Sequence, residues 1–158
     1  MIAVDITDDM VIKARYKTLE MGQLNQSILN GAGTLAGFIG EQVALKVMGG
    51  KWLNTYDYDI VLDNGQTVDV KTKQTSVPPL SYYECSVAKL NTKQKCDIYA
   101  FVRVKKDLSV AWFLGSKNKT EYFENAVFKK KGDKDGDNNF IVRSDCYNMA
   151  ITELDQPN

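Results

Sequence analysis

Four side chains of this sequence have types and spacings that suit acid–base and metal chemistry. Asp69 and Lys71 are separated by one residue in a segment that alternates like a β-strand, so both side chains are expected on one face. Asp59 precedes and Asp69 follows residues 63–65, which read Asp-Asn-Gly and favour a tight hairpin turn. Antiparallel pairing would then bring the two carboxylates close together. Glu41 comes earlier, in a segment whose apolar residues have helical spacing.

Carboxylates that converge on the edge of a sheet make an oxygen-rich site of the kind that Mg²⁺ or Mn²⁺ prefers. Without a cation the like charges would repel, and one group would tend to take up a proton. A neighbouring lysine can orient or deprotonate a water molecule and stabilise charge that develops on a phosphate. A bound metal polarises the phosphoryl oxygen and lowers the pKa of its water. The set therefore predicts hydrolysis of a phosphodiester bond.

Histidine is absent from the sequence, which excludes several other kinds of site. A Ser-His-Asp triad, a Cys-His pair and a histidine zinc site all need this residue. The three cysteines, Cys85, Cys96 and Cys146, form no C-x-x-C pair and are odd in number. A disulfide framework or a zinc ribbon is therefore not expected. We expect the three cysteines to be buried free thiols instead.

The formal net charge is zero, but the charges are unevenly distributed along the chain. Residues 1–70 hold five Lys/Arg and nine Asp/Glu, whereas residues 71–106 hold eight Lys/Arg and only two Asp/Glu. An acidic part followed by a basic part suits a metal-binding cluster beside a face that binds a polyanion. A solvated surface with unevenly spread lysines is the alternative interpretation of the same pattern.

The length of 158 residues suits one domain over residues 1–158. Hydrophobic residues make up 44% and charged residues 25% of the chain, which excludes a disordered or low-complexity protein. No apolar run approaches the roughly 20 residues of a membrane span, so no membrane partner is expected. Residues 1–9 contain three aspartates and no basic residue, unlike a secretory signal, so a cytoplasmic location is expected.

The spacing of apolar and turn-forming residues predicts the elements that would position these side chains. The first half should contain two helices and a hairpin: a helix over 8–21, a polar loop over 23–34, a helix over 34–48 ended by Gly49-Gly50, and strands over 58–62 and 66–73. The second half should contain mainly strands: a strand or loop edge over 82–87, a central strand over 97–104, a strand over 108–114, a helix over 119–126 and a strand over 140–143.

The order of the chemical residues resembles the PD-(D/E)xK nuclease superfamily. Glu41 stands in Phe-Ile-Gly-Glu on a helix, Asp59 follows, and Asp-Val-Lys over 69–71 lies on the next strand. The resemblance covers about residues 30–104. It implies an α/β, restriction-endonuclease-like fold, in which a mixed central sheet is flanked by helices with an αβββαβ core. Residues 107–158 would add a C-terminal β/α extension.

The resemblance also implies a role for each residue. Asp59 and Asp69 would bind the metal with help from the Val70 carbonyl, Glu41 would be the accessory helical acid, and Lys71 would position or activate the nucleophilic water. The implied activity is Mg²⁺-dependent (or Mn²⁺-dependent) hydrolysis of DNA by an endonuclease, a resolvase-like enzyme or an exonuclease. Small enzymes of this kind are often encoded by phages, which would place the protein in the host cytoplasm. Double-strand cutters need two sites, so a homodimer is expected.

The sequence departs from the family pattern before the first aspartate, where Tyr58 replaces a proline. Asp57 is an alternative first metal ligand. We favour Asp59 because it directly precedes the apolar residues 60–62.

Polar residues near the cluster could contact the phosphates of a nucleic acid without reading its sequence. They are Lys73, Gln74, Lys93, Gln94 and Lys95. Tyr82 and Tyr83 could stack on bases or pack as sheet aromatics, and the 23–34 loop could face the substrate. Two rival hypotheses remain: a catalytically inert nucleic-acid-binding module on the same fold, and a structural protein in which the acidic cluster is accidental.

Overall fold

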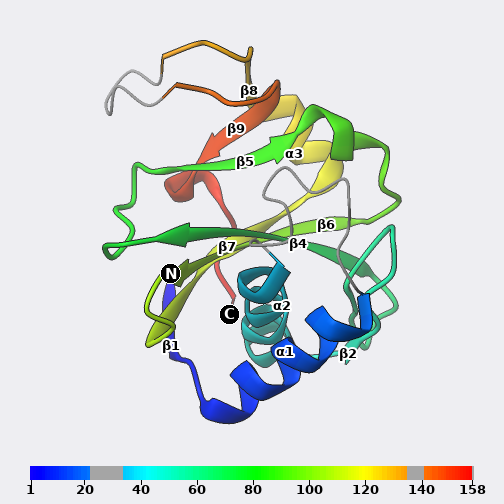
Figure 1. Ribbon diagram of the computed structural model, residues 1–158. Helices are drawn as coiled ribbons and strands as arrows, with labels where there is room; N and C mark the ends of the chain where they lie inside the picture. The colour runs from blue at the N-terminus through cyan, green and yellow to red at the C-terminus, as the bar shows by residue number, and fades with distance from the viewer. Residues whose placement is uncertain (22–33, 135–140, 158) are drawn as a thin grey trace.

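A mixed six-stranded sheet forms the centre of the computed structural model, which describes residues 1–21, 34–134 and 141–157 (Figure 1). Strands β4 and β6 pair in parallel, and every other described pair in this sheet is antiparallel. From edge to edge the strands are β1 (Ile2–Asp5), β7 (Val110–Asn118), β6 (Ile98–Lys105), β4 (Thr67–Thr75), β3 (Ile60–Val61) and β2 (Lys51–Trp52).

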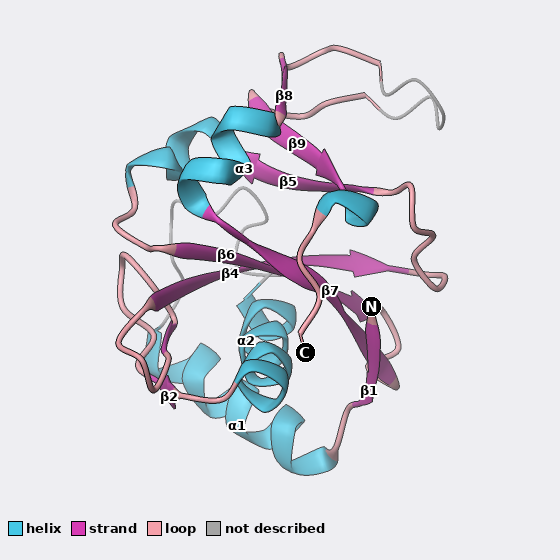
Figure 2. Cartoon of the chain, turned by 180° about the vertical axis from the view of Figure 1, so that it is seen from behind, coloured by secondary structure: helices cyan, strands magenta, loops and turns pink. Residues whose placement is uncertain are grey.

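The two faces of this sheet are covered by different kinds of element. Helices α1 (Asp8–Met21) and α2 (Thr34–Met48) lie on one face (Figure 1). Helix α3 (Lys119–Asn125) and a second, three-stranded sheet cover the other face (Figure 2). The order of the second sheet is β5 (Glu84–Ala88), β9 (Cys146–Ala150) and β8 (Val127–Lys129). The α/β class and the mixed central sheet are confirmed, whereas helices alone do not flank the sheet as expected.

The order of elements follows the expected core with one change. Helix α2 is followed by the antiparallel strands β2, β3 and β4, and then by β6 in parallel with β4. The second helix of the expected αβββαβ order is not formed. Residues 76–97 contain instead β5, which belongs to the second sheet, and the short 3₁₀ helix η1 (Lys89–Lys93). A five-residue segment rich in Asn, Thr and Lys has too few apolar residues to form a helix that packs on the sheet.

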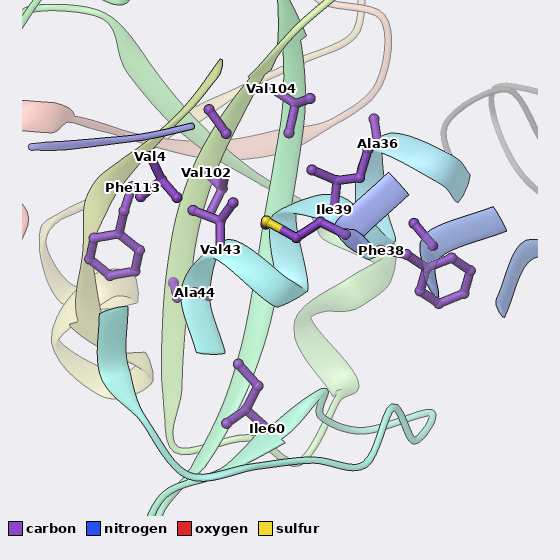
Figure 3. Packing of buried hydrophobic residues seen from close by; sticks show 14 of the residues in the cluster. Val4, Ala36, Phe38, Ile39, Val43, Ala44, Ile60, Val102, Val104 and Phe113 are labelled. Atoms are coloured by element: carbon purple, nitrogen blue, oxygen red, sulfur yellow. The ribbon is translucent and has the colours of Figure 1, made fainter. Parts of the chain in front are cut away.

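Two hydrophobic clusters lie on opposite faces of the central sheet. The cluster under the helices includes Ile39 and Val43 of α2, and Val102 of β6 (Figure 3). The cluster on the other face includes Tyr99 of β6 and Tyr122 of α3. Strand β6 contributes alternate residues to both clusters and is buried from Tyr99 to Val104, which confirms its predicted central position.

Several predicted elements agree closely with the structure. The helix over 34–48 has the predicted bounds, and the positive φ angles of Gly49 (77°) and Gly50 (93°) end it. The hairpin forms as predicted, with Ile60 opposite Val68 and a φ angle of +85° at Gly65. The predicted loop over 23–34 lies outside the described residues apart from Thr34, which begins α2.

Other predicted elements differ. Strand β3 is only two residues long rather than five, because residues 53–58 form a compact loop before it. The prediction of a strand over 140–143 was wrong for residues 141–143, which the structure describes, because Ile141 forms only an isolated bridge to Lys134. The strand in this part of the chain is β9, at Cys146–Ala150. Strands β1, β2 and β8 were not predicted. They are two to four residues long, which is too short to show an apolar period. None of the described helices is long and apolar enough to cross a membrane.

Candidate active site

Asp59 occupies the point where strands β3 and β4 separate. Strand β3 pairs with β4 only at Thr67 and Val68. The Asp59 N–H donates to the Val68 carbonyl at 2.8 Å, and the Val70 N–H donates to Asp59 Oδ2 at 2.7 Å. The carboxylate thus replaces the backbone partner that β4 loses at this point, which fixes the side chain against the open edge of the sheet.

The loop between β2 and β3 holds Asp59 from the other side. The N–H groups of Leu53 and Asn54 both donate to the Asp59 carbonyl, at 2.8 and 3.0 Å. The hydroxyl of Thr55 donates to the Tyr58 carbonyl at 2.7 Å, which closes the loop. Asn54 has a φ angle of 51°, a left-handed conformation that asparagine tolerates better than most residues. Asp59 is therefore fixed by hydrogen bonds at its N–H, its carbonyl and its side chain.

Asp69 and Lys71 lie on one face of β4, as their spacing predicts, and form an ion pair. The Lys71 side chain is only 15% exposed. Its Nζ donates to Gln94 Oε1 at 2.9 Å and lies 5.8 Å from the centroid of the Tyr99 ring. Asp69 Oδ2 is buried and, among the described residues, accepts no hydrogen bond of good geometry in spite of the ion pair. This oxygen therefore has capacity for a further ligand.

Gln94 holds Lys71 because it is itself held at both ends. Its Nε2 donates to the Tyr56 carbonyl at 3.0 Å, and its own carbonyl accepts a hydrogen bond from Lys119 Nζ. The residue lies directly after η1, in the segment that replaces the expected second helix. Gln94 is thus partly buried and holds the lysine in place, and its contact with a phosphate stays a prediction.

Glu41 reaches the cluster from helix α2. Its Oε2 accepts a hydrogen bond from Trp52 Nε1 at 2.6 Å, and Lys17 Nζ lies 5.8 Å from the Trp52 ring centroid. The preceding residue, Gly40, allows α2 to approach β4 closely, since a Cβ there would lie 2.0 Å from Thr72 Oγ1. The helix therefore brings the Glu41 carboxylate, which is buried, next to the edge of β4.

The electrostatics show that three carboxylates share a poorly solvated space. Burial, opposed by the Trp52 hydrogen bond and reinforced by the charge of Asp69, raises the pKa of Glu41 from 4.5 to about 7. Burial, together with the charges of Glu41 and Asp69, raises the pKa of Asp59 from 3.8 to about 8. Both shifts express the cost of keeping negative charges close together away from water. A cation bound between them would remove that cost.

The donors suit a hard divalent cation. Carboxylate oxygens are the ligands that Mg²⁺ and Mn²⁺ prefer, and Asp69 Oδ2, which contacts Lys71 but accepts no hydrogen bond among the described residues, could bind one. Nevertheless, within the described part of the chain, no group of three carboxylate or cysteine side chains is arranged to hold a metal ion. Closing such a ligand set requires side chains of the cluster to move.

No protein-family model matches the chain, and no curated protein sequence matches it. What the cluster can do must therefore be inferred from its geometry and chemistry.

The structure brings together the main residues predicted from the sequence and separates others from them. Glu41, Asp59, Asp69 and Lys71 belong to one cluster, with the Val70 N–H bound to Asp59. Asp57 lies apart, since its Oδ1 accepts a hydrogen bond from the Lys95 N–H at 3.0 Å. Four residues predicted to bind nucleic acid are exposed: Lys73, Gln74, Lys93 and Lys95.

Trp52, Tyr99 and Lys119 contribute to the site but were not predicted. Each acts through a contact between residues distant in the sequence: Trp52 on Glu41, Tyr99 on Lys71, and Lys119 on Gln94. Trp52 belongs to a two-residue strand without periodicity, and Tyr99 resembles any aromatic residue of a buried strand. Nothing in their local sequence distinguishes these residues from ordinary core or surface positions.

Proposed function

We propose that this chain is a metal-dependent phosphodiesterase of the PD-(D/E)xK type, with a restriction-endonuclease-like core, and that it hydrolyses DNA. The observation that carries the proposal is the convergence of Asp59, Asp69 and Lys71 at the open edge of β4, with Glu41 beside them. Two acids and a lysine at this spacing match the family motif, and the succession of α2, β2, β3, β4 and parallel β6 is compatible with its core.

Asp59 and Asp69 would hold Mg²⁺ or Mn²⁺, with Glu41 and the Val70 carbonyl as further ligands. When bound, the metal supplies positive charge that polarises the phosphoryl oxygen and acidifies water. Lys71 Nζ, fixed by Gln94 and by the Tyr99 ring, orients the attacking water and donates to a phosphate oxygen. The water oxygen bonds to phosphorus as the bond to the leaving sugar oxygen breaks. Water also supplies the proton that the leaving oxygen finally carries, so no other reactant is needed.

The decisive experiment is cleavage of supercoiled plasmid, linear duplex, single strand and four-way junction with Mg²⁺, Mn²⁺ or EDTA. Asp69→Asn keeps the shape of the side chain, and Lys71→Met keeps an unbranched chain of similar length; each removes the charge. Asp63→Asn is the matched control, because Asp63 is an exposed carboxylate on the turn of the same hairpin. We expect metal-dependent cleavage that both site variants lose and the control retains. Unchanged cleavage by Asp69→Asn would overturn the proposal.

One observation favours the alternative of an inert nucleic-acid-binding module. The Lys71 ammonium already neutralises Asp69, as it would in a site that no longer binds metal. That alternative predicts no cleavage of any substrate in the panel, together with DNA binding that weakens steeply as salt is added. It also predicts that Asp69→Asn binds DNA as tightly as the original protein, because no metal bridges the two.

A further inference from the structure

A groove between the central sheet and the second sheet extends away from the cluster. Its volume is about 500 Å³, and its walls include Lys73 and Arg103 on the central sheet, Tyr83 beside β5, and Lys129 and Arg143 beyond. A smaller adjoining cavity of about 160 Å³ shares Lys73 and Arg103 with the groove and is also lined by Lys71. The groove therefore continues from the lysine of the candidate active site.

Arg103 is the unusual residue of this groove, because it is a cation that is only 8% exposed. Its Nη2 donates to the Glu84 carbonyl at 3.2 Å, and its guanidinium carbon lies 5.1 Å from the centroid of the Tyr83 ring. Among the described residues, no carboxylate forms an ion pair with it. A guanidinium has five N–H donors, and a buried charge is costly unless it is paired. An anionic ligand would supply the missing partner.

The other charges of the groove leave it basic. Among the described residues of the walls, Glu84 is the acidic one, and its carboxylate binds Lys129 Nζ at 2.7 and 2.9 Å. The same walls carry four basic residues, Lys73, Arg103, Lys129 and Arg143. The groove therefore suits a polyanion better than a neutral or cationic ligand.

The register of β4 and β6 places this basic pair next to the cluster. Asp69 lies opposite Tyr99, and Lys73 lies opposite Arg103, with Lys71 in the row between them. Alternate residues share a face, so the Lys73–Arg103 row lies about 6.6 Å along the strands from Lys71. A phosphate bound there would belong to the nucleotide next to the one whose phosphate lies at the cluster.

We propose that Arg103 and Lys73 form a phosphate subsite that draws one unpaired nucleic-acid strand into the groove. The inference rests on the proposed function and names its substrate class as single-stranded segments or ends. A volume of about 500 Å³ is that of a small-ligand pocket; it admits about one or two nucleotides and is too small for a duplex. Tyr82 is 53% exposed and packs edge-on against Tyr83 at 5.1 Å, which leaves its ring available to stack on a base.

The test is equilibrium binding of fluorescein-labelled oligothymidylate and of a labelled blunt duplex, measured by fluorescence anisotropy in EDTA so that nothing is cleaved. We expect the single strand to bind more tightly than the duplex. Arg103→Gln should weaken single-strand binding by at least about tenfold, and Arg103→Lys by less. Lys73→Gln should lower the slope of log affinity against log salt by about 0.7.

Lys46→Gln is the matched control, because Lys46 is an exposed lysine of α2, on the opposite face of the central sheet. Lys73→Gln alters an exposed residue, so it keeps the proposal testable if Arg103→Gln fails to fold. Equal affinity for single strand and duplex would overturn the proposal, as would unchanged binding by Lys73→Gln. The binding assay tests the subsite separately from the proposed function, which the cleavage assay tests. Asp69→Asn should keep single-strand binding, even if the original protein cleaves no substrate.

Discussion

The Asp59 carboxylate has a structural role and a chemical role that make opposite demands on it. As a hydrogen-bond acceptor for the Val70 N–H, it completes the ladder at the point where β3 and β4 separate. As a charge, it lies beside Glu41 and Asp69 in a buried space, which raises its pKa to about 8. The hydrogen bond needs only an oxygen, whereas metal binding needs the negative charge. The two roles can therefore be separated by a substitution that keeps the oxygen.

We expect Asp59→Asn to stabilise the metal-free protein at alkaline pH. A carboxyl with a raised pKa in the folded chain contributes stability that is fully present below its unfolded pKa, and that stability is lost as the pH rises through the folded value. For Asp59 this window runs from 3.8 to about 8. Asparagine does not titrate and keeps the acceptor, so at about pH 9 the variant should exceed the original protein by at least about 1 kcal/mol.

The measurement is urea unfolding in EDTA at about pH 5 and about pH 9. The difference in unfolding free energy between Asp59→Asn and the original protein should be smaller at the lower pH. At the higher pH, Mg²⁺ added in excess over EDTA should stabilise the original protein more than the variant. Asp63→Asn, on the exposed turn, should change neither curve. A destabilising effect of Asp59→Asn at both pH values would show that the carboxylate is needed as a charge for folding.

At the scale of elements, the sequence predicts well where a pattern is long and local. Helix α2 shows apolar residues at helical spacing over its whole length and two glycines at its end, so its bounds of Thr34 and Met48 could be predicted. The bounds of strand β9 could not be predicted, because Asn148 interrupts the apolar pattern of the strand with a buried amide. Among the described residues, the hydrogen-bond partners of this amide are Ser86 Oγ at 2.5 Å, which is distant in the sequence, and Cys146 Sγ at 3.2 Å, which is a weak acceptor.

The candidate site shows the same contrast between residues that a local pattern predicts and contacts that no local pattern predicts. Residue types and spacing predicted Glu41, Asp59, Asp69 and Lys71, since a helix and one hairpin are enough to place them. The contact of Gln94 with Lys71 depends on how residues 76–97 leave the central sheet for the second one. No local pattern in the sequence specifies that residues 76–97 cross to the second sheet. The helix expected there was therefore wrong, and the contact of Gln94 with Lys71 was not predicted.

The close contact between α2 and β4 gives a prediction at this scale. Gly40→Ala would place a Cβ 2.0 Å from Thr72 Oγ1 and 2.9 Å from its Cγ2, so the helix or the strand must shift. We expect a loss of about 1–3 kcal/mol in stability, the usual cost of overpacking. Because Glu41 is the next residue on the helix, cleavage should fall further than the loss of folded protein explains.

Gly37→Ala is the matched control on the same helix, because a Cβ there meets nothing within 4 Å. It should leave stability unchanged or raise it by up to about 1 kcal/mol, since alanine favours helix more than glycine does. Chemical unfolding gives the stability of each variant, and cleavage per folded molecule gives the effect on the site. Equal behaviour of the two variants would contradict the close approach of α2 to β4.

At the scale of the whole molecule, the central sheet separates two clusters with different tasks. The cluster under α1 and α2 supports the edge of β4 from below, and the cluster on the other face attaches the second sheet that forms a wall of the groove. The basic segment 71–106 contributes Lys71, Lys73 and Arg103 to the site and the groove, so its charge lies where the proposed substrate would bind. A homodimer stays a prediction, which light scattering in solution can test.

The hydroxyl of Tyr122 links two neighbouring strands of this wall, β5 and β9. The side chain is fully buried, and its oxygen lies 2.9 Å from the Cys85 carbonyl of β5 and 2.8 Å from the Tyr147 carbonyl of β9. Burial raises the pKa of Tyr122, so the phenol stays protonated and can donate. One hydroxyl has one proton, so the two carbonyls share a single donor. Tyr122→Phe keeps the ring packed against Tyr99 and Phe101 and removes only this link.

We expect Tyr122→Phe to loosen the second sheet while the central sheet stays intact. The cost should be about 1–3 kcal/mol, because two buried carbonyls lose their shared donor. Hydrogen exchange should accelerate in β5 and β9 and stay slow in β6, since local opening needs less free energy than global unfolding. Tyr16→Phe, at an exposed position of α1, should change nothing. Equal acceleration in β6 would mean that the two sheets unfold as one unit, and the wall of the groove could not then move independently of the site.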